Sequence, residues 1–248
     1  MQSVRYNRAM KILFSPAKTL HLSIDHDNAL SQPLFQDEAI KLFLYLKHFS
    51  KAKIQKTFHL SDKLADEVFA LYHNFEKNNT TYPALKLYNG LAFRQLHSDT
   101  YTHKQLDYAS KHLRICSAMY GLLSPMDGIW PYRLDFTISL AKFNLKKQWT
   151  PKINEVLKEE DLILNLASEE FSSLISHPNM HTVYFFDEKD GIRKVNSAEA
   201  KKARGQCLEW CILNQFKDIS ELKKFELKDY TFDSQDNLQT TFIRQLKR

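Results

Sequence analysis

The chain is poor in glycine, proline and cysteine. Its 248 residues include only 5 Gly, 7 Pro and 3 Cys. So little glycine and proline excludes collagen-like and low-complexity chains and leaves few places for a flexible linker, so we expect one domain, although the length also allows two smaller ones. An odd number of cysteines does not build a disulfide framework. Cys207 and Cys211 lie four residues apart on an expected helix, a spacing more typical of core packing than of redox or metal chemistry.

Long apolar runs and known cofactor motifs are absent as well. No run approaches the roughly 18 apolar residues of a spanning helix, so we expect no membrane insertion and a cytoplasmic location. Residues 1–9 lack the apolar segment of a signal peptide, and we interpret them as an alternative start or as residues added before Met10. There is no G-x-G-x-x-G, P-loop or H-E-x-x-H pattern, so we predict no cofactor and no metal site.

Positive charge is concentrated in one segment. The whole chain carries a net charge of +6, and its sequence pI is near 9.0. Between Lys41 and Lys63, six lysines stand against one acid, Asp62, which leaves +5 in this stretch. A solvated helix face is the ordinary explanation of a charge run. An excess placed in one segment favours a polyanionic partner instead.

Hydrophobic periodicity predicts strands that alternate with helices. Short buried strands are expected at Lys11–Phe14 and Leu162–Leu166, each stopped by polar turn residues. A further strand-like run covers 114–123, and the DEKDG turn joins 183–186 to 192–195 as a hairpin. Helices are expected over 37–49, 50–58, 61–72, 107–113, from Glu169, and over 198–216, with Ser50, Ser61 or Asp62, and Ser197 as N-caps. This order predicts an α/β fold with a mixed sheet and surrounding helices.

Three of the expected strands end in loops that carry small and polar residues. These residues are Ser15, Lys18 and Thr19 in the first loop, Tyr120, Ser124 and Asp127 in the second, and Asn165 and Ser168 in the third. If the strands run parallel, their carboxyl ends meet at one edge of the sheet and the loops form one ligand pocket. Turns and N-caps select the same residue types for structural reasons, so both explanations stay open.

An arginine lies inside the apolar stripe of the last long helix. At about 100° per residue, Arg204 falls on the same arc as Ala200 and Cys207, and Lys201 borders it. A buried guanidinium needs a partner. Arg204 therefore either faces a pocket that holds an anion or forms an internal ion pair, with Asp127, Asp135 or Glu169 as partners. The two alternatives have equal weight.

Five blocks of the sequence resemble the YaaA peroxide-stress family. In chain order they are MKILFSPAKTL at 10–20, YNGLAF at 88–93, LRICSAMYGLLSPMDGIWPYRLDF at 113–136, LNLASEEF at 164–171 and AKKARGQ at 200–206. The resemblance implies one α/β domain of unusual topology over 10–248, which binds DNA through a positively charged cleft. It also implies a part in the response to hydrogen peroxide, by limiting reactive intracellular iron, and no established reaction.

The resemblance further implies a DNA-binding element similar to a helix-hairpin-helix, and residues 51–76 fit it. The turn at 58–62 has no glycine, unlike regular versions of this motif, so phosphate contacts rest on side chains and on the N-terminus of the following helix. The expected DNA-binding residues are Lys51, Lys53, Lys56, Ser61 and Lys63. The family blocks also hold the candidate pocket residues for a small anionic ligand, which are Ser15, Lys18, Tyr120, Arg133, Asn165, Ser168, Lys201, Lys202 and Arg204.

Three functions compete at this point. The leading hypothesis is a DNA-binding stress protein whose partner is double-stranded or structured DNA. The second is an enzyme that acts on a nucleotide, a nucleobase or damaged nucleic acid through a pocket at the strand ends. Direct iron sequestration is disfavoured because the sequence has no Glu-x-x-His pair of the di-iron type, so any effect on iron is expected to be indirect.

Overall fold

The computed structural model describes residues 10–23, 30–75 and 80–246. Residues 1–9, interpreted above as an alternative start or added residues, and residue 76 of the helix-hairpin-helix-like segment lie outside this range. The main sheet has the strand order β4-β3-β1-β6-β7-β10-β9, and β8 pairs with β7. Its strands are β1 Met10–Phe14, β3 Leu113–Ser117, β4 Gly121–Leu123, β6 Leu162–Asn165, β7 Met180–Lys189, β8 Ile192–Lys194, β9 Thr231–Gln235 and β10 Gln239–Gln245.

The centre of the sheet is parallel and its margins are antiparallel. Neighbouring strands β3, β1, β6, β7 and β10 all run in the same direction, whereas β4, β8 and β9 run against their partners. The strands predicted at Lys11–Phe14 and Leu162–Leu166 are the adjacent central strands β1 and β6, and all of β6 is buried. Burial on both faces explains why these strands are continuously apolar. The predicted α/β fold with a mixed sheet is confirmed.

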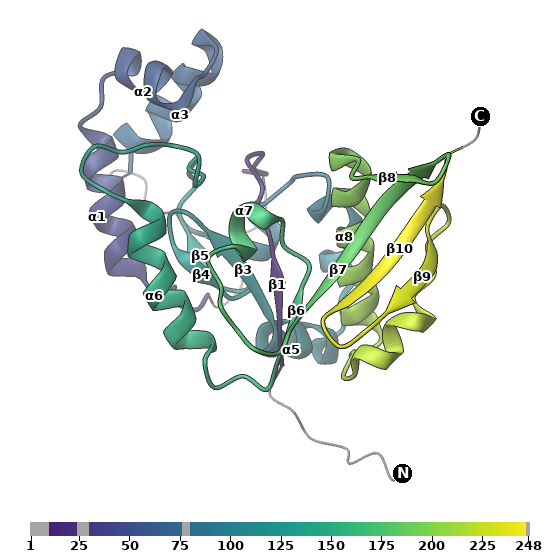
Figure 1. The fold of residues 1–248 in the computed structure, drawn as a ribbon. Coiled ribbons are helices and arrows are strands. Elements are labelled where there is room, and N and C mark those ends of the chain that lie inside the picture. The colour runs from purple at the N-terminus through teal and green to yellow at the C-terminus, as the bar shows by residue number, and fades with distance from the viewer. Residues whose placement is uncertain (1–9, 24–29, 76–79, 247–248) are drawn as a thin grey trace.

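Helices cover the sheet and extend beyond it. They are α1 Gln36–Lys47, α2 Lys51–Phe58, α3 Asp62–His73, α4 Ala84–Leu87, α5 His103–His112, α6 Leu145–Leu157, α7 Glu169–Ser172 and α8 Ser197–Leu213. Short 3-10 helices lie at η1 Phe93–Gln95, η2 Ser98–Thr100 and η3 Ile219–Lys224, and a small second sheet pairs β2 Tyr82–Pro83 with β5 Gly128–Ile129. Helix α5 packs on β1 and β3, α8 packs on β7, and α6 packs on β4. Figure 1 shows α2 and α3 together at one corner, past the carboxyl ends of the central strands.

Two local predictions were wrong. The run 114–123 is two antiparallel strands rather than one, because the Ser117 hydroxyl accepts the N–H groups of Met119 and Tyr120 and Gly121 takes a φ of 72°. The N-cap of α8 is Asn196, not Ser197, and its side chain accepts hydrogen bonds from the N–H groups of two following residues. The predicted hairpin is confirmed, since β7 and β8 pair in antiparallel fashion across Asp190 and Gly191, which both have positive φ.

The α2–α3 hairpin is held to the rest of the molecule by a buried tyrosine. Tyr72 of α3 donates a hydrogen bond to the carbonyl oxygen of Arg133, at 2.6 Å. Ser50 caps α2 through its side chain, as predicted, whereas Ser61 is the N-cap residue of α3 without a side-chain capping bond. His59 ends α2 with a φ of 52°, the left-handed conformation that a glycine usually supplies in such a turn. The hairpin therefore forms without a glycine and has a fixed position beside residue 133.

Candidate pocket and nucleic-acid interface

A cavity of about 580 Å³ lies at the carboxyl ends of β1 and β6. Because these two strands are parallel neighbours, the loops that follow them meet at one edge of the sheet. The lining comes from 14–19, 90–93, 132–135, 166 and 168–171, together with Ser197, Lys201 and Arg204 of α8. The sequence analysis left open whether three strand-end loops form one pocket; the loops after β1 and β6 do meet here.

Two glycines allow the wall formed by residues 90–93 to fit between its neighbours. A Cβ atom at Gly205 of α8 would lie 2.1 Å from the carbonyl oxygen of Ala92, and one at Gly90 would lie 2.7 Å from the Cβ of Ala17. Residues 90–93 are therefore wedged between the loop after β1 and α8. The sequence analysis did not identify this role. A glycine inside an otherwise helical pattern is the signal that indicates such a close approach.

Two serines join the strand ends at the base of the pocket. The Ser15 hydroxyl donates to the Ser168 hydroxyl at 3.3 Å and accepts the backbone N–H of Ser168 at 2.8 Å. Asn165 supports the same turn from within the sheet, because its side chain accepts the N–H of Ala167 and donates to Thr182. Asn165 is buried and is not part of the cavity lining. Its hydrogen bonds stabilise the turn after β6, and its side chain does not face a ligand in the cavity.

One side of the pocket is acidic. Lys18 Nζ lies 2.5 Å from Asp135 Oδ2, and Thr137 donates to the same carboxylate. Burial opposes ionisation of Asp135, but the contacts with Lys18 and Thr137 together lower its pKa below the usual value. Glu170 accepts the N–H of Phe136 at 3.2 Å, and burial raises the pKa of Glu170. The pocket thus holds one neutralised ion pair and one carboxylate that is poorly solvated.

The opposite side, formed by α8, is cationic. Arg204 is half-buried, and its Nε is enclosed with no hydrogen-bond partner in the described part of the chain. Burial lowers the pKa of this guanidinium. The ion-pair alternative for Arg204 is wrong, since none of the proposed carboxylate partners among the described residues pairs with it, while Arg204 and the exposed Lys201 both line the cavity. Lys202 points elsewhere and pairs with Glu199 at 2.9 Å.

The second strand-end loop does not reach the pocket. Because β4 runs antiparallel to β3, the chain returns toward the amino ends of the central strands, and Ser124 and Asp127 lie there. The Asp127 carboxylate accepts a hydrogen bond from the Ser31 hydroxyl. Tyr120 stays at the turn but is fully buried, and its hydroxyl accepts the N–H of Trp130. The structure therefore brings six of the nine candidates into the pocket lining, namely Ser15, Lys18, Arg133, Ser168, Lys201 and Arg204, and leaves out Tyr120, Asn165 and Lys202.

A second cavity, of about 330 Å³, lies between the α2–α3 turn and residues that also line the pocket. One of its walls is formed by residues 58–61 and Leu64, and the other by residues 133–135, 137 and 138. Both cavities share Lys18, Arg133, Leu134 and Asp135, so they lie on two sides of one wall. We call the two cavities together the cleft. The α2–α3 turn forms its outer end and Arg204 its inner end.

The five expected DNA-binding residues lie on the hairpin, in unequal electrostatic settings. Lys51 Nζ contacts Asp62 at 3.0 Å and Asp66 at 2.7 Å, so two acids offset its charge. Lys53 lies over the ring of Phe49, and its ammonium is 3.8 Å from the ring centroid. The remaining three, Lys56, Ser61 and Lys63, are exposed. The freest cations of the hairpin are therefore those on the exposed side of α2 and at the start of α3.

The described ranges contain neither a metal-binding cluster nor a membrane-spanning helix. No group of three or more His, Cys, Asp and Glu side chains is arranged to hold a metal ion there. No helix among the residues described is long and apolar enough to cross a membrane.

The chain resembles known proteins over almost its whole length. The family model of the peroxide stress protein YaaA matches residues 10–236. A UPF0246 protein of Marinomonas sp. (strain MWYL1) is 38% identical over 252 residues, and the match covers 95% of this chain and 97% of that protein. UPF0246 proteins of Francisella tularensis subsp. novicida (34% identical, 92% and 98% covered) and Lactiplantibacillus plantarum (31%, 94% and 98%) are also similar. The chain therefore belongs to the peroxide stress protein YaaA family and has a role in the peroxide stress response.

Proposed function

We propose that this protein acts in the peroxide response as a DNA-binding protein that keeps reactive intracellular iron low. Its ligand in this proposal is double-stranded or structured DNA, held at the phosphate backbone along the cleft. One observation carries the proposal: the α2–α3 turn forms one wall of a cavity, and the other wall of that cavity, with Lys18 and Arg133, also lines the pocket that holds Arg204 and Lys201. Six separate segments of the chain thus line the two cavities.

The chemistry of this surface suits phosphate groups. Lys56 and Lys63 are exposed at the outer end, and the first turn of α3 offers backbone N–H groups that the Ser61 side chain does not cap. Such groups bind phosphate oxygens irrespective of sequence. The hydrogen bond from Tyr72 to Arg133 fixes the hairpin against the opposite wall, which reduces the entropy lost when DNA is bound.

The proposed binding carries little sequence preference. Neither α2, with 8 residues, nor α3, with 12, presents a row of base-reading side chains, and the exposed residues of the turn are His59, Ser61 and Asp62. The effect on iron is indirect in this proposal, because the protein binds DNA and not iron. Bound protein changes which other molecules reach the DNA, or which genes are expressed.

A salt titration tests the proposal. Affinity for one duplex is measured for the parent chain and for the double variant Lys53→Glu/Lys56→Glu over a range of salt concentrations. Log K should fall with log salt, at about −0.9 per phosphate contact, and removing two contacts should reduce the slope by roughly 2. The double variant should bind so weakly at moderate salt that no complex is detected.

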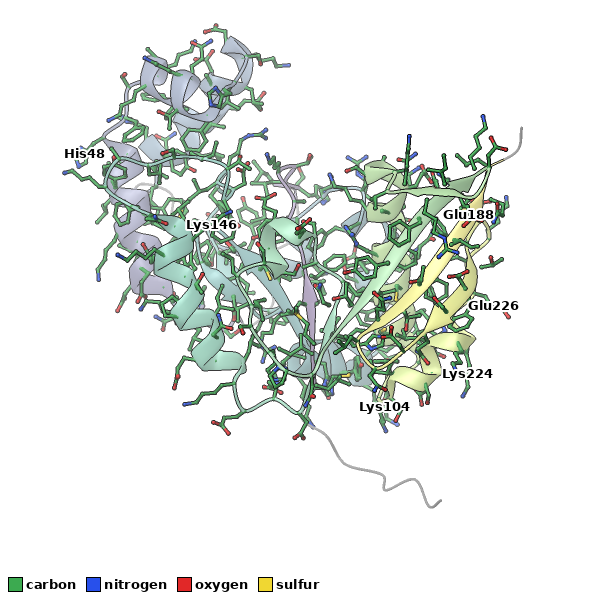
Figure 2. All side chains as sticks on the ribbon, viewed as in Figure 1. His48, Lys104, Lys146, Glu188, Lys224 and Glu226 are labelled. Carbon is green, nitrogen blue, oxygen red and sulfur yellow. The ribbon has the colours of Figure 1, made fainter. Side chains whose placement is uncertain are left out.

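The matched control carries the same change of charge at a distance from the cleft. Lys104 and Lys224 are exposed and lie on the side of the molecule away from α2 and α3, as Figure 2 shows. Lys104→Glu/Lys224→Glu should bind with nearly the parent's affinity and slope. If the two double variants behave alike, or if Lys53→Glu/Lys56→Glu binds like the parent, the hairpin is only a solvated surface.

A further inference from the structure

The inner end of the cleft has a guanidinium, that of Arg204, whose Nε finds no hydrogen-bond partner among the described residues. Arg204 has no carboxylate partner among the described residues, and its Nε is buried without a hydrogen bond. Lys201, one turn earlier on α8, lines the same cavity. An enclosed guanidinium without an acceptor is costly, so the site is favourable for an anionic group that accepts from it.

Carboxylates stand on the other side of the same cavity. Glu169 and Glu170 begin α7 at the carboxyl end of β6 and line the pocket opposite α8. Glu170 keeps one hydrogen bond, from Phe136, which leaves further acceptor positions on its carboxylate. A ligand that fits both sides carries an anionic group at one end and N–H donors at the other.

The size and floor of the pocket narrow the class of ligand further. About 580 Å³ is far more than a phosphate ion needs and falls in the range of small-molecule sites. The floor is aromatic, with Phe14, Phe93 and Tyr132 almost completely buried and two of these rings 5.2 Å apart, edge to face. A lining with aromatic and apolar residues suits the ring of a nucleobase.

From this arrangement we infer that the pocket binds one nucleoside monophosphate unit, with its phosphate at Arg204 and Lys201 and the N–H edge of its base at Glu169 and Glu170. The unit has two sources. One is a free nucleotide, and the other is a nucleotide turned out of a DNA strand that lies along the cleft. Only the second source rests on the proposed DNA binding, through the shared wall of Lys18 and Arg133.

Calorimetry with free ligands tests the pocket by itself. The probes are the four deoxynucleoside monophosphates, the matching nucleosides and inorganic phosphate, added to the full chain. We expect at least one nucleotide to bind, more tightly than its nucleoside and than phosphate. Arg204→Met should weaken that binding at least tenfold, whereas Lys202→Met, a neighbour on α8 outside the lining, should leave it unchanged. Glu170→Gln should weaken nucleotide binding without affecting phosphate.

The melting temperature of each variant is measured as well, because an unfolded variant would also fail to bind the nucleotide. No carboxylate in the described part of the chain pairs with Arg204, so the substitution leaves no buried acid unpaired and Arg204→Met should melt at or near the temperature of the parent. An unchanged nucleotide affinity in Glu170→Gln would contradict the assigned contact with the base.

A duplex carrying 2-aminopurine at a mismatch tests the second source. Its fluorescence should rise when the parent binds and the base leaves the stack. Arg204→Met should keep most of the duplex affinity but lose this rise. Lys53→Glu/Lys56→Glu should lose duplex binding yet still bind the free nucleotide.

The outcomes separate the two proposals. Nucleotide binding without a fluorescence rise assigns the pocket to free nucleotides. If no nucleotide binds at millimolar concentration and the fluorescence of a bound duplex stays flat, the inference is overturned, while DNA binding is judged by its own titration.

Discussion

Gly205 provides a sharp test of how the pocket wall is packed. In an exposed helix interior, replacing glycine by alanine stabilises a protein by about 1 kcal/mol, because alanine loses less backbone entropy on folding. At position 205 the opposite is expected. The added Cβ would lie 2.1 Å from the carbonyl oxygen of Ala92 and 2.9 Å from its Cα, and backbone atoms are not free to rotate away as a side chain does.

The size of the effect follows from the distances. Contacts of a Cβ atom below 3.0 Å are essentially never observed, so α8 and residues 90–93 must separate by about 0.9 Å. Overpacking of this kind costs roughly 1–3 kcal/mol. Because the clash is with backbone atoms, we expect the upper part of this range, about 2–3 kcal/mol. After subtraction of the gain of about 1 kcal/mol in helix propensity, a net loss of about 1–2 kcal/mol remains for Gly205→Ala.

Urea unfolding measures this directly, as a lower midpoint at an unchanged m value. Gln206→Ala, at the next and exposed position of α8, is the control and should stay within about 0.5 kcal/mol of the parent. A Gly205→Ala variant as stable as the parent, or more stable, would refute the close packing of α8 on residues 90–93 and with it the shape of the pocket.

Two further predictions concern the ion pair that joins β7 to β10. Asp187 accepts two hydrogen bonds from Arg244, at 2.9 and 2.8 Å, so Asp187→Asn should cost about 1.5–3 kcal/mol at neutral pH, measured by urea unfolding. The hydrogen bonds from Arg244 hold the pKa of Asp187 below its ordinary 3.8. The stabilisation is therefore complete above that value and is lost as the pH falls through the lower folded-state pKa. The gap in stability between parent and Asp187→Asn should narrow below about pH 4, and a gap that stays constant down to pH 2 would contradict this assignment.

Much of the fold could be predicted from the sequence because local and tertiary preferences agree. The central strands β1 and β6 are apolar on both faces and stop at polar turns, and α1 to α3 show helical spacing with a serine at the start of α2 and α3. Where the sequence predictions failed, a neighbouring side chain decides the structure. Ser117 turns the chain after β3, and the Asn196 side chain caps α8 one residue before the expected Ser197.

The site was predictable only in part, for a physical reason. Ser15 and Ser168 follow two neighbouring parallel strands, and they meet because the carboxyl ends of such strands lie at the same edge of the sheet. The alternation of strands and helices in the sequence is typical of such a sheet. Tyr120 has the same local signals, but the return of β4 buries it. Asp66, one of the two acidic partners of Lys51, was missed as well, because the charge count stopped at Lys63, before Asp66 on the next turn of α3. The lack of a partner for Arg204 depends on long-range packing that helix periodicity does not reveal.

The measurement that tests the central claim most directly is amide hydrogen–deuterium exchange of the full chain with and without a duplex. If DNA lies along the cleft, exchange should slow at 58–64 and 133–138, which form the two walls next to the hairpin, and at 15–19, where Lys18 lines both cavities. Residues 219–224, in η3 at the far side of the molecule, should exchange at the same rate in both states. Protection confined to the C-terminal strands, with none at 58–64 or 133–138, would contradict binding of DNA in the cleft.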